Sequence, residues 1–245
     1  MDNKESINSK ELLSYYENEA EDVPIFGSLR EISLTENILS QTPSFTNAID
    51  IGCGEGYLLF RLSERKKERL YGLDLSEGRI NTTKKYVPSA SLLRGDVLSL
   101  PFPDNSFDIV FCSELLEHIT DYKKVVDELI RISKRSIIIT VPNELPLVSV
   151  MCPKCKTKHF LDGHVNFFTE HNLKAIFLNR NDVHICDVRK FHSIYTYNRI
   201  TMKLPLFLRL FLDQNLLKLH KKISFLKPNF LMITLEKVNK KNKEI

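Results

Sequence analysis

The sequence predicts an α/β protein with a doubly wound, mostly parallel sheet of seven strands. Two observations lead to this prediction. Short apolar segments of strand length alternate with segments of helical periodicity, and a glycine-rich turn follows the first of these strands. Alternation at this spacing favours right-handed βαβ crossovers, which place consecutive strands parallel and cover both faces of the sheet with helices.

Length and composition are those of a globular protein. Of 245 residues, 42% are hydrophobic and 27% charged, which excludes collagen-like and disordered chains. No apolar run approaches the ~20 residues of a membrane-spanning helix. The net charge of +4 does not demand a nucleic-acid partner. A polar N-terminus without a signal-peptide pattern and five irregularly spaced cysteines predict a reducing, cytoplasmic location.

We expect a single domain over 1–245 that begins with a helical cap, 1–43. Two stretches of the cap have helical periodicity, 9–20 and 29–40, and Pro24 and Gly27 separate them.

The next part, 44–144, has the clearest alternation of strands and helices. Strands are expected at 47–51, 70–75, 90–95, 106–112 and 135–141. Helices are expected at 56–69, 76–86, 113–119 and 121–133.

The remaining part, 145–236, is less regular and precedes a basic tail, 237–245. It contains a Cys/His-rich insert after the fifth strand, 152–164, and a helix, 170–180. Two late strands are expected at 182–191 and 228–238. A second insert, 203–227, separates the late strands and carries six Lys or Arg against one Asp among many Leu and Phe. It is either a lid helix packed on the domain or a basic amphipathic surface for anionic lipid.

The glycine turn and a carboxylate beyond it indicate a nucleoside ligand. Gly52, Gly54 and Gly56 follow a strand and precede a helix, so the backbone can turn sharply and approach a ligand. Asp74 ends the next strand, 22 residues beyond Gly52, a position that suits hydrogen bonds to a ribose diol.

The same turn departs from the dinucleotide pattern G-x-G-x-x-G, because Tyr57 stands where the third glycine belongs. Asp50 would also place negative charge beside a pyrophosphate. S-adenosylmethionine (SAM) carries an ammonium, a sulfonium and no phosphate, so it suits this acidic turn better. A nucleotide-dependent oxidoreductase is the alternative.

Four blocks in this order resemble the class I SAM-dependent methyltransferases: 50–56, 72–76, 94–110 and 112–119. The resemblance implies that the acidic and glycine residues of the first block face the methionine part of SAM, that the second block holds its ribose, the third its adenine, and that the fourth closes the methionine end. The implied cofactor-binding residues are Asp50, Gly52, Cys53, Gly54, Gly56, Asp74, Leu75, Asp96, Val97, Cys112 and Ser113. Alternatively these are ordinary strand-end and capping residues, and Gly-Asp at Asp96 is also a common turn.

Glu114, Glu117 and His118 form an E-x-x-E-H block whose members would share one face of a helix. The block resembles that of ubiquinone-pathway O-methyltransferases and small-RNA 2′-O-methyltransferases, which use a divalent metal. The resemblance implies a further histidine, for which His164 is the candidate, and a Zn²⁺ or Mg²⁺ ion that lowers the pKa of an acceptor hydroxyl. Without a metal, His118 and His164 are the candidate bases. The alternative is that the acidic residues merely favour a helix N-terminus.

A second metal site competes for the same histidine. Cys152, Cys155, His159 and His164 have the ligand types of tetrahedral zinc, although their spacing is compressed relative to a zinc finger.

Together these patterns predict a SAM-dependent methyltransferase acting on the hydroxyl of a small-molecule or lipid-linked acceptor, with peripheral membrane contact through 203–227. RNA 2′-O-methylation is a less favoured alternative, because no RNA-binding module is recognisable. A non-catalytic SAM-binding module is the alternative of another class.

Overall fold

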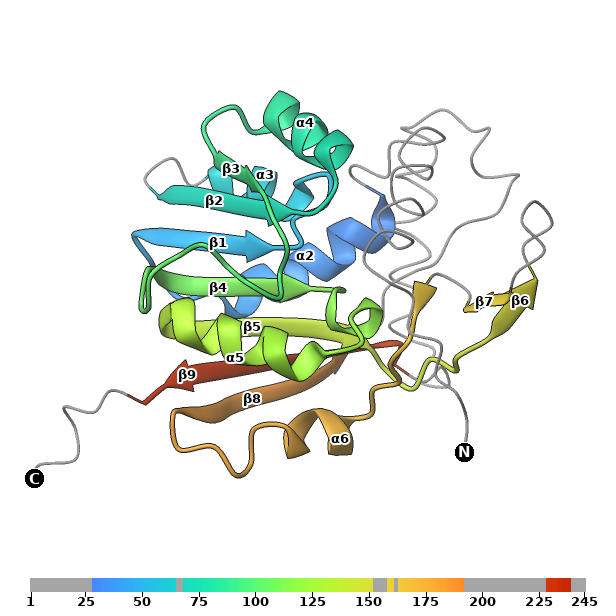
Figure 1. The fold of residues 1–245 in the computed structure, drawn as a ribbon. Helices are drawn as coiled ribbons and strands as arrows, with labels where there is room; N and C mark the ends of the chain where they lie inside the picture. Colours follow the sequence, from blue (N-terminus) through green and yellow to red (C-terminus); the bar gives the residue numbers. More distant parts are fainter. Residues whose placement is uncertain (1–27, 65–67, 152–157, 161–162, 192–227, 239–245) are drawn as a thin grey trace, which may run out of the picture.

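The computed structural model describes residues 28–64, 68–151, 158–160, 163–191 and 228–238 (Figure 1). The helices are α2 Leu29–Gln41, α3 Tyr57–Ser63, α4 Glu77–Tyr86, the 3₁₀ helix η1 Leu116–His118, α5 Tyr122–Ile132 and α6 Glu170–Ala175. The main-sheet strands are β1 Asn47–Ile51, β2 Arg69–Asp74, β3 Ser91–Arg94, β4 Phe107–Ser113, β5 Ser133–Pro142, β8 Val183–Phe191 and β9 Phe230–Lys237.

The seven strands lie in the order β3-β2-β1-β4-β5-β9-β8. The first five are parallel, and β9 runs antiparallel to both of its neighbours, β5 and β8. The predicted doubly wound, mostly parallel seven-stranded sheet is therefore confirmed.

Helices cover both faces of the sheet and create two cores. On one face of the sheet, α5 and α6 pack against strand residues such as Ile49, Val110 and Ile139. On the other face, α2 and α3 pack against strand residues such as Ala48 and Ile109. Because side chains alternate along a strand, neighbouring residues of β1 belong to different cores. Strands buried on both faces read as continuous apolar runs, which is why they could be located in the sequence.

Local sequence signals begin the helices where they were expected. At α2, the Ser28 side chain accepts a hydrogen bond from the Glu31 N–H while the Glu31 carboxylate accepts one from the Ser28 N–H. At α5, the Asp121 side chain caps the first turn of the helix. The buried side of this helix includes Val125, Val126 and Leu129. Exchange of a capping residue of this kind for alanine costs about 1 kcal/mol.

The carboxyl ends of β1, β4 and β5 lie at one edge of the sheet, the edge at which ligands bind in open α/β folds. Because β9 is reversed, its first residue, Phe230, pairs with Pro142 at that same edge. A small antiparallel hairpin of β6 Ser149–Met151 and β7 Lys158–Phe160 stands off on this side (Figure 1).

Two sequence-based expectations need correction. The predicted helix over 113–119 is wrong: Glu114 has a positive φ of 53°, and only a single 3₁₀ turn follows it, at η1. The Cys/His insert, expected to be loop-like, contains strand β7, which pairs with β6 just before the insert. The predicted helix 9–20 and the second insert, 203–227, lie outside the described residues. Among the described helices, none is long and apolar enough to cross a membrane.

Candidate functional site

Three glycines shape the turn between β1 and α3. Gly52, Gly54 and Gly56 have φ angles of 77°, 54° and 84°, a region that residues with a side chain rarely adopt. A Cβ at Gly56 would lie 2.4 Å from Cγ2 of Thr83 in α4, so this position also needs glycine for close packing. A Cβ at Gly54 would meet nothing within 4 Å. The turn is therefore packed on one side and open at its tip.

Asp74, at the end of β2, holds this turn in place. Its Oδ2 accepts a hydrogen bond from the Gly54 N–H at 2.9 Å, and its Oδ1 accepts one from the Ser76 N–H at 2.9 Å. Each carboxylate oxygen can accept a second hydrogen bond. Asp74 thus orders the glycine turn while keeping the capacity to bind a diol.

Asp50 is the second acidic group beneath the turn. It is 3% exposed, and its Oδ1 receives no hydrogen bond from any described residue. Burial, reinforced by the charge of Asp74, raises the pKa of Asp50 to about 7. A buried carboxylate without a partner is costly, and a cation bound at the turn would relieve that cost.

The remaining predicted cofactor residues follow the ends of neighbouring parallel strands. Leu75 comes directly after β2, and Asp96 and Val97 come two and three residues after β3. Val97 is buried, whereas Asp96 is exposed and its Oδ1 accepts a hydrogen bond from the Leu98 N–H at 2.9 Å. This contact is the local turn that the alternative interpretation of Asp96 predicted.

Cys112 and Ser113 end β4. Cys112 is fully buried, and its burial together with the charges of Glu117 and Asp50 raises the pKa of its thiol well above the usual value. The Ser113 hydroxyl shares a 2.8 Å hydrogen bond with the Thr140 hydroxyl. A Cβ at Gly52 in the cofactor turn would lie 3.1 Å from Cδ1 of Leu115, so the turn that carries the E-x-x-E-H block packs against the cofactor turn.

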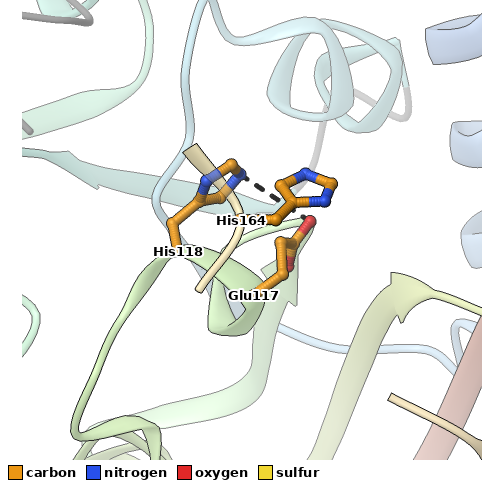
Figure 2. A group of neighbouring side chains, drawn as sticks. All are labelled: Glu117, His118 and His164. Carbon is orange, nitrogen blue, oxygen red and sulfur yellow. Dashed lines mark ion pairs between the residues drawn. The ribbon is translucent and has the colours of Figure 1, made fainter. Parts of the chain in front are cut away.

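That block lies on a tight turn instead of a helix. The Glu114 N–H donates to the Thr140 carbonyl at 3.0 Å, which ties the turn to β5 and keeps Glu114 in the left-handed region. The three predicted ligands therefore do not share one helical face. The 3₁₀ turn nevertheless directs Glu117 and His118 toward His164, as Figure 2 shows.

Glu117, His118 and His164 form a compact cluster, which we call the EHH cluster. Each offers one ligand atom, and these atoms lie within 4.8 Å of one another. The Oε1 of Glu117 is 3.8 Å from Nε2 of His118, and the two imidazole rings meet edge to face at 4.8 Å (Figure 2). Glu117 is 1% exposed, and neither of its oxygens receives a well-formed hydrogen bond from a described residue.

His164 reaches this cluster because its segment is pinned to η1. The N–H groups of Val165 and Asn166 both donate to the Glu117 carbonyl, at 2.8 and 3.0 Å. The Asn166 side-chain amide donates to the carbonyls of Leu116 and Ile119, at 2.8 and 2.7 Å. Four hydrogen bonds thus fix a segment almost fifty residues downstream against the turn after β4.

Burial controls the charge of the EHH cluster. It raises the pKa of Glu117 well above its usual range, with help from the nearby charge of Glu114. It lowers the pKa of His118 to about 3, with help from His164. The imidazole of His118 is therefore neutral at neutral pH, which is the form that binds metals.

Glu114 is held apart from the EHH cluster by a residue that the sequence analysis missed. Its Oε2 accepts a 2.8 Å hydrogen bond from Nη2 of Arg30 in α2, and the guanidinium also lies 5.3 Å from the ring centroid of Phe230. Burial still raises the pKa of Glu114 to about 7. Arg30 precedes Glu114 by 84 positions and belongs to no recognisable motif, so no local pattern identifies it.

The proposed zinc site at the Cys/His insert can be followed only in part. Cys152 and Cys155 lie outside the described residues, and His159 is located by its backbone in β7 alone. His164, which both predicted metal sites claimed, lies in the EHH cluster.

Comparisons with known proteins agree with this arrangement. Residues 49–139 match the family model described as a methyltransferase domain. A demethylmenaquinone methyltransferase of Shouchella clausii is 35% identical over 96 residues, which cover 36% of this chain and 41% of that protein. The chain thus spans about two fifths of the length of the curated relatives it matches.

Solved structures extend the likeness of fold to most of the chain. A SAM-dependent methyltransferase from Mesorhizobium loti is 17% identical with a TM-score of 0.57, covering 87% of this chain and all of that one. The [4+2]-cyclase SpnF is 15% identical with a TM-score of 0.59, covering 84% of this chain and 80% of that one. Residues 49–139 thus resemble a methyltransferase domain, and the sheet as a whole has the fold seen in solved SAM-dependent methyltransferases.

Proposed function

We propose that this protein transfers the methyl group of SAM to a hydroxyl oxygen of a small-molecule or lipid-linked acceptor, with a divalent cation at the EHH cluster. One observation carries the proposal. A buried carboxylate and two histidines converge at the turn after β4, and Leu115 of that turn packs against Gly52 of the turn expected to hold the methionine end of SAM. A hydroxyl at this place would lie between the methyl donor and groups that handle its proton.

SAM is the ligand that the acidic glycine turn suits. Asp50 has a buried oxygen that receives no hydrogen bond within the described part of the chain and that a cation would satisfy, and Asp74 has spare acceptor capacity for the ribose hydroxyls. The open tip at Gly54 leaves room for a ligand to approach the backbone. These features support SAM over a pyrophosphate-bearing dinucleotide, whose charge the two carboxylates would repel.

The EHH cluster also has the donor set of a divalent cation. Glu117 contributes a buried carboxylate to which no described residue donates a hydrogen bond, and His118 contributes a neutral imidazole. Two imidazoles with one carboxylate favour Zn²⁺ over Mg²⁺, which prefers oxygen ligands. When bound, such a cation would supply Lewis acidity that lowers the pKa of the acceptor hydroxyl.

The proposed transfer needs little covalent chemistry from the protein. The acceptor oxygen would attack the methyl carbon in line as the carbon–sulfur bond breaks, leaving S-adenosylhomocysteine. Asp50 and Asp74 would position the donor, while Glu117 and His164 would position the acceptor oxygen. In the absence of a cation, His164 would accept the hydroxyl proton, because the lowered pKa of His118 makes that imidazole a weak base.

The acceptor class follows from the names of relatives and from the E-x-x-E-H block. The relatives named demethylmenaquinone methyltransferases, which this chain matches over about two fifths of their length, support a small-molecule acceptor. The E-x-x-E-H block with a downstream histidine also keeps RNA 2′-O-methylation as the second candidate. SpnF, which is named as a [4+2]-cyclase, has a similar fold, so the fold alone does not determine the reaction.

Methyl transfer from isotope-labelled SAM tests the proposal. The acceptors are a panel of phenols and sugars, a bacterial lipid extract, and short RNA, and mass spectrometry locates the methyl group. We expect an O-methyl product, and Glu117→Gln to lose transfer while still binding SAM. Glu36→Gln, an exposed glutamate paired with Arg61, is the matched control and should keep full activity. Methylation of carbon or nitrogen, or unchanged transfer by Glu117→Gln, would contradict the proposal.

A further inference from the structure

A second group of metal-ligand side chains lies on the β8–β9 pair. Its members are His184 and Cys186 of β8 and Glu236 of β9, and their ligand atoms lie within 4.8 Å of one another. All three residues are exposed. Among the three cysteines that the structure describes, Cys186 is the exposed one, whereas Cys53 and Cys112 are buried.

The pairing of β8 with β9 brings the three side chains together. His184 pairs with Glu236 across the strands, and the register then shifts between Ile185 and Asp187, so that Cys186 has no partner residue in β9. Because side chains alternate along a strand, Cys186 shares a face with His184, two residues before it. Cys186 therefore lies beside the His184–Glu236 pair.

The distances suit a single cation. Nε2 of His184 and Oε2 of Glu236 are 3.4 Å apart, and two ligand atoms bound to one tetrahedral zinc lie about 3.2–3.8 Å apart, given metal–ligand bonds of roughly 2.0–2.3 Å. A small rotation of the Cys186 side chain would complete the triangle. A thiolate, an imidazole and a carboxylate together favour Zn²⁺ over Mg²⁺ or Ca²⁺.

The local charge also favours a bound cation. The Glu236 carboxylate places a negative charge within 4.8 Å of the Cys186 sulfur. Arg189 is engaged with Asp187 and does not neutralise Glu236. A divalent cation would offset the negative charge and bind the thiolate.

We propose that His184, Cys186 and Glu236 form a Zn²⁺ site separate from the methyl-transfer site. Glu236 pairs with Ser136 near the start of β5, whereas Pro142, at the other end of β5, marks the edge that carries the cofactor turn. Six residues of extended strand separate the two positions, which corresponds to about 20 Å. A cation here would clamp the edge strand and would not take part in methyl transfer.

Protection of one thiol tests this site in the intact chain. Untagged, metal-free protein is alkylated with iodoacetamide with and without Zn²⁺, and peptide mass spectrometry follows Cys186 separately from Cys152 and Cys155. With Zn²⁺ at about ten times its dissociation constant, we expect Cys186 to react roughly tenfold more slowly, because only the free thiol reacts. A chelator should restore the rate.

Two variants decide whether the proposed ligands act together. His184→Ala should abolish most of the protection of Cys186, and Glu236→Gln should weaken it. His171→Ala removes an exposed histidine of α6 that lies outside both clusters, so it should leave the protection unchanged. Equal reactivity of Cys186 with and without Zn²⁺, or full protection in His184→Ala, would overturn the proposal. Circular dichroism of each variant confirms that it is folded.

Discussion

The cofactor half and the acceptor side of this protein are encoded in different ways. In the cofactor half, the glycine turn and Asp74 lie within 25 residues of each other and form one β-turn-α-β unit. On the acceptor side, Arg30, Glu117 and His164 come from the cap, the turn after β4 and the late insert. A local unit can be recognised from sequence alone, whereas an assembled cluster depends on tertiary contacts that no motif records.

The largest expected effect separates the two regions functionally. A His118→Ala/His164→Ala double variant should lower methyl transfer by about 10²–10³-fold, because acceptor positioning and proton handling are lost together. Its affinity for SAM should stay within about twofold, since neither residue lies in the glycine turn. Radiometric transfer and calorimetry measure the two quantities, and His171→Ala is the control. A parallel loss of SAM affinity would mean that the two regions are one site.

Stability provides the next test, within the cofactor half. Gly56→Ala should lower the free energy of unfolding by about 3 kcal/mol, because it combines a strained positive φ with a clash against buried Thr83. The Thr83 hydroxyl donates to the Gly54 carbonyl at 2.8 Å, so this side chain is not free to move away. Gly54→Ala has the same strain without the clash and should cost about 1 kcal/mol. Urea denaturation compares them, and equal losses would contradict the packing argument.

Arg30 connects the cap to the acceptor side, so its removal tests whether this contact stabilises the acceptor side. Arg30→Ala should cost about 2 kcal/mol of stability, because Glu114 would keep a buried carboxylate without its cation. The expected loss of stability is smaller than for a fully buried pair, because solvent partly screens the exposed side of Arg30. Arg61→Ala breaks a surface pair with Glu36 and should cost less than about 1 kcal/mol. If thermal unfolding gives equal losses, the Arg30–Glu114 contact does not anchor the cap.

The smallest predicted effect is a pH dependence of cofactor affinity. Without ligand, the pKa of Asp50 is raised to about 7, and binding of cationic SAM favours the ionised carboxylate. The dissociation constant should therefore rise as pH falls below about 7, by at most tenfold per unit. Asp50→Asn should bind more weakly at pH 8 and lose this dependence. Calorimetry between pH 5.5 and 8.5, which is about the stable range of most proteins, measures it.

The stability of the unliganded protein should change in the opposite direction. The folded pKa of Asp50, about 7, exceeds its ordinary value of 3.8, so the folded state binds more protons between these values. Stability therefore falls as pH rises from about 4 to about 7, and Asp50→Asn should remove this contribution. If the variant is less stable than the parent at pH 8, the carboxylate is not the buried, unpaired group described above.

Much of the fold could be predicted because the strands are apolar runs and the helices carry their own caps. The antiparallel insertion of β9 between β5 and β8 could not, since nothing in its sequence records which strands it pairs with. The helix expected over 113–119 was wrong because Glu114 adopts a left-handed conformation that its hydrogen bond to Thr140 supports. Helical periodicity in a short segment does not reveal such a tertiary contact.

The sequence predicted the cofactor part of the candidate site more completely than the acceptor part. The glycine turn, Asp74 and the strand-end residues lie at one edge, as the motifs indicated. The structure places His164 beside Glu117 and His118, whose role as metal ligands stays a prediction, and it pairs Glu114 with Arg30. The His184–Cys186–Glu236 group was not foreseen, because it depends on the pairing of β8 with β9, which are distant in sequence.

Calorimetric titration of the purified protein with SAM, before and after chelation, tests the central claim most directly. We expect micromolar binding in both states, a similar affinity for S-adenosylhomocysteine, and loss of binding in Asp74→Ala but not in Glu117→Gln. That pattern would place the cofactor at the glycine turn and assign the EHH cluster to the acceptor. Failure of the parent protein to bind either ligand, or equal binding by Asp74→Ala, would contradict the account.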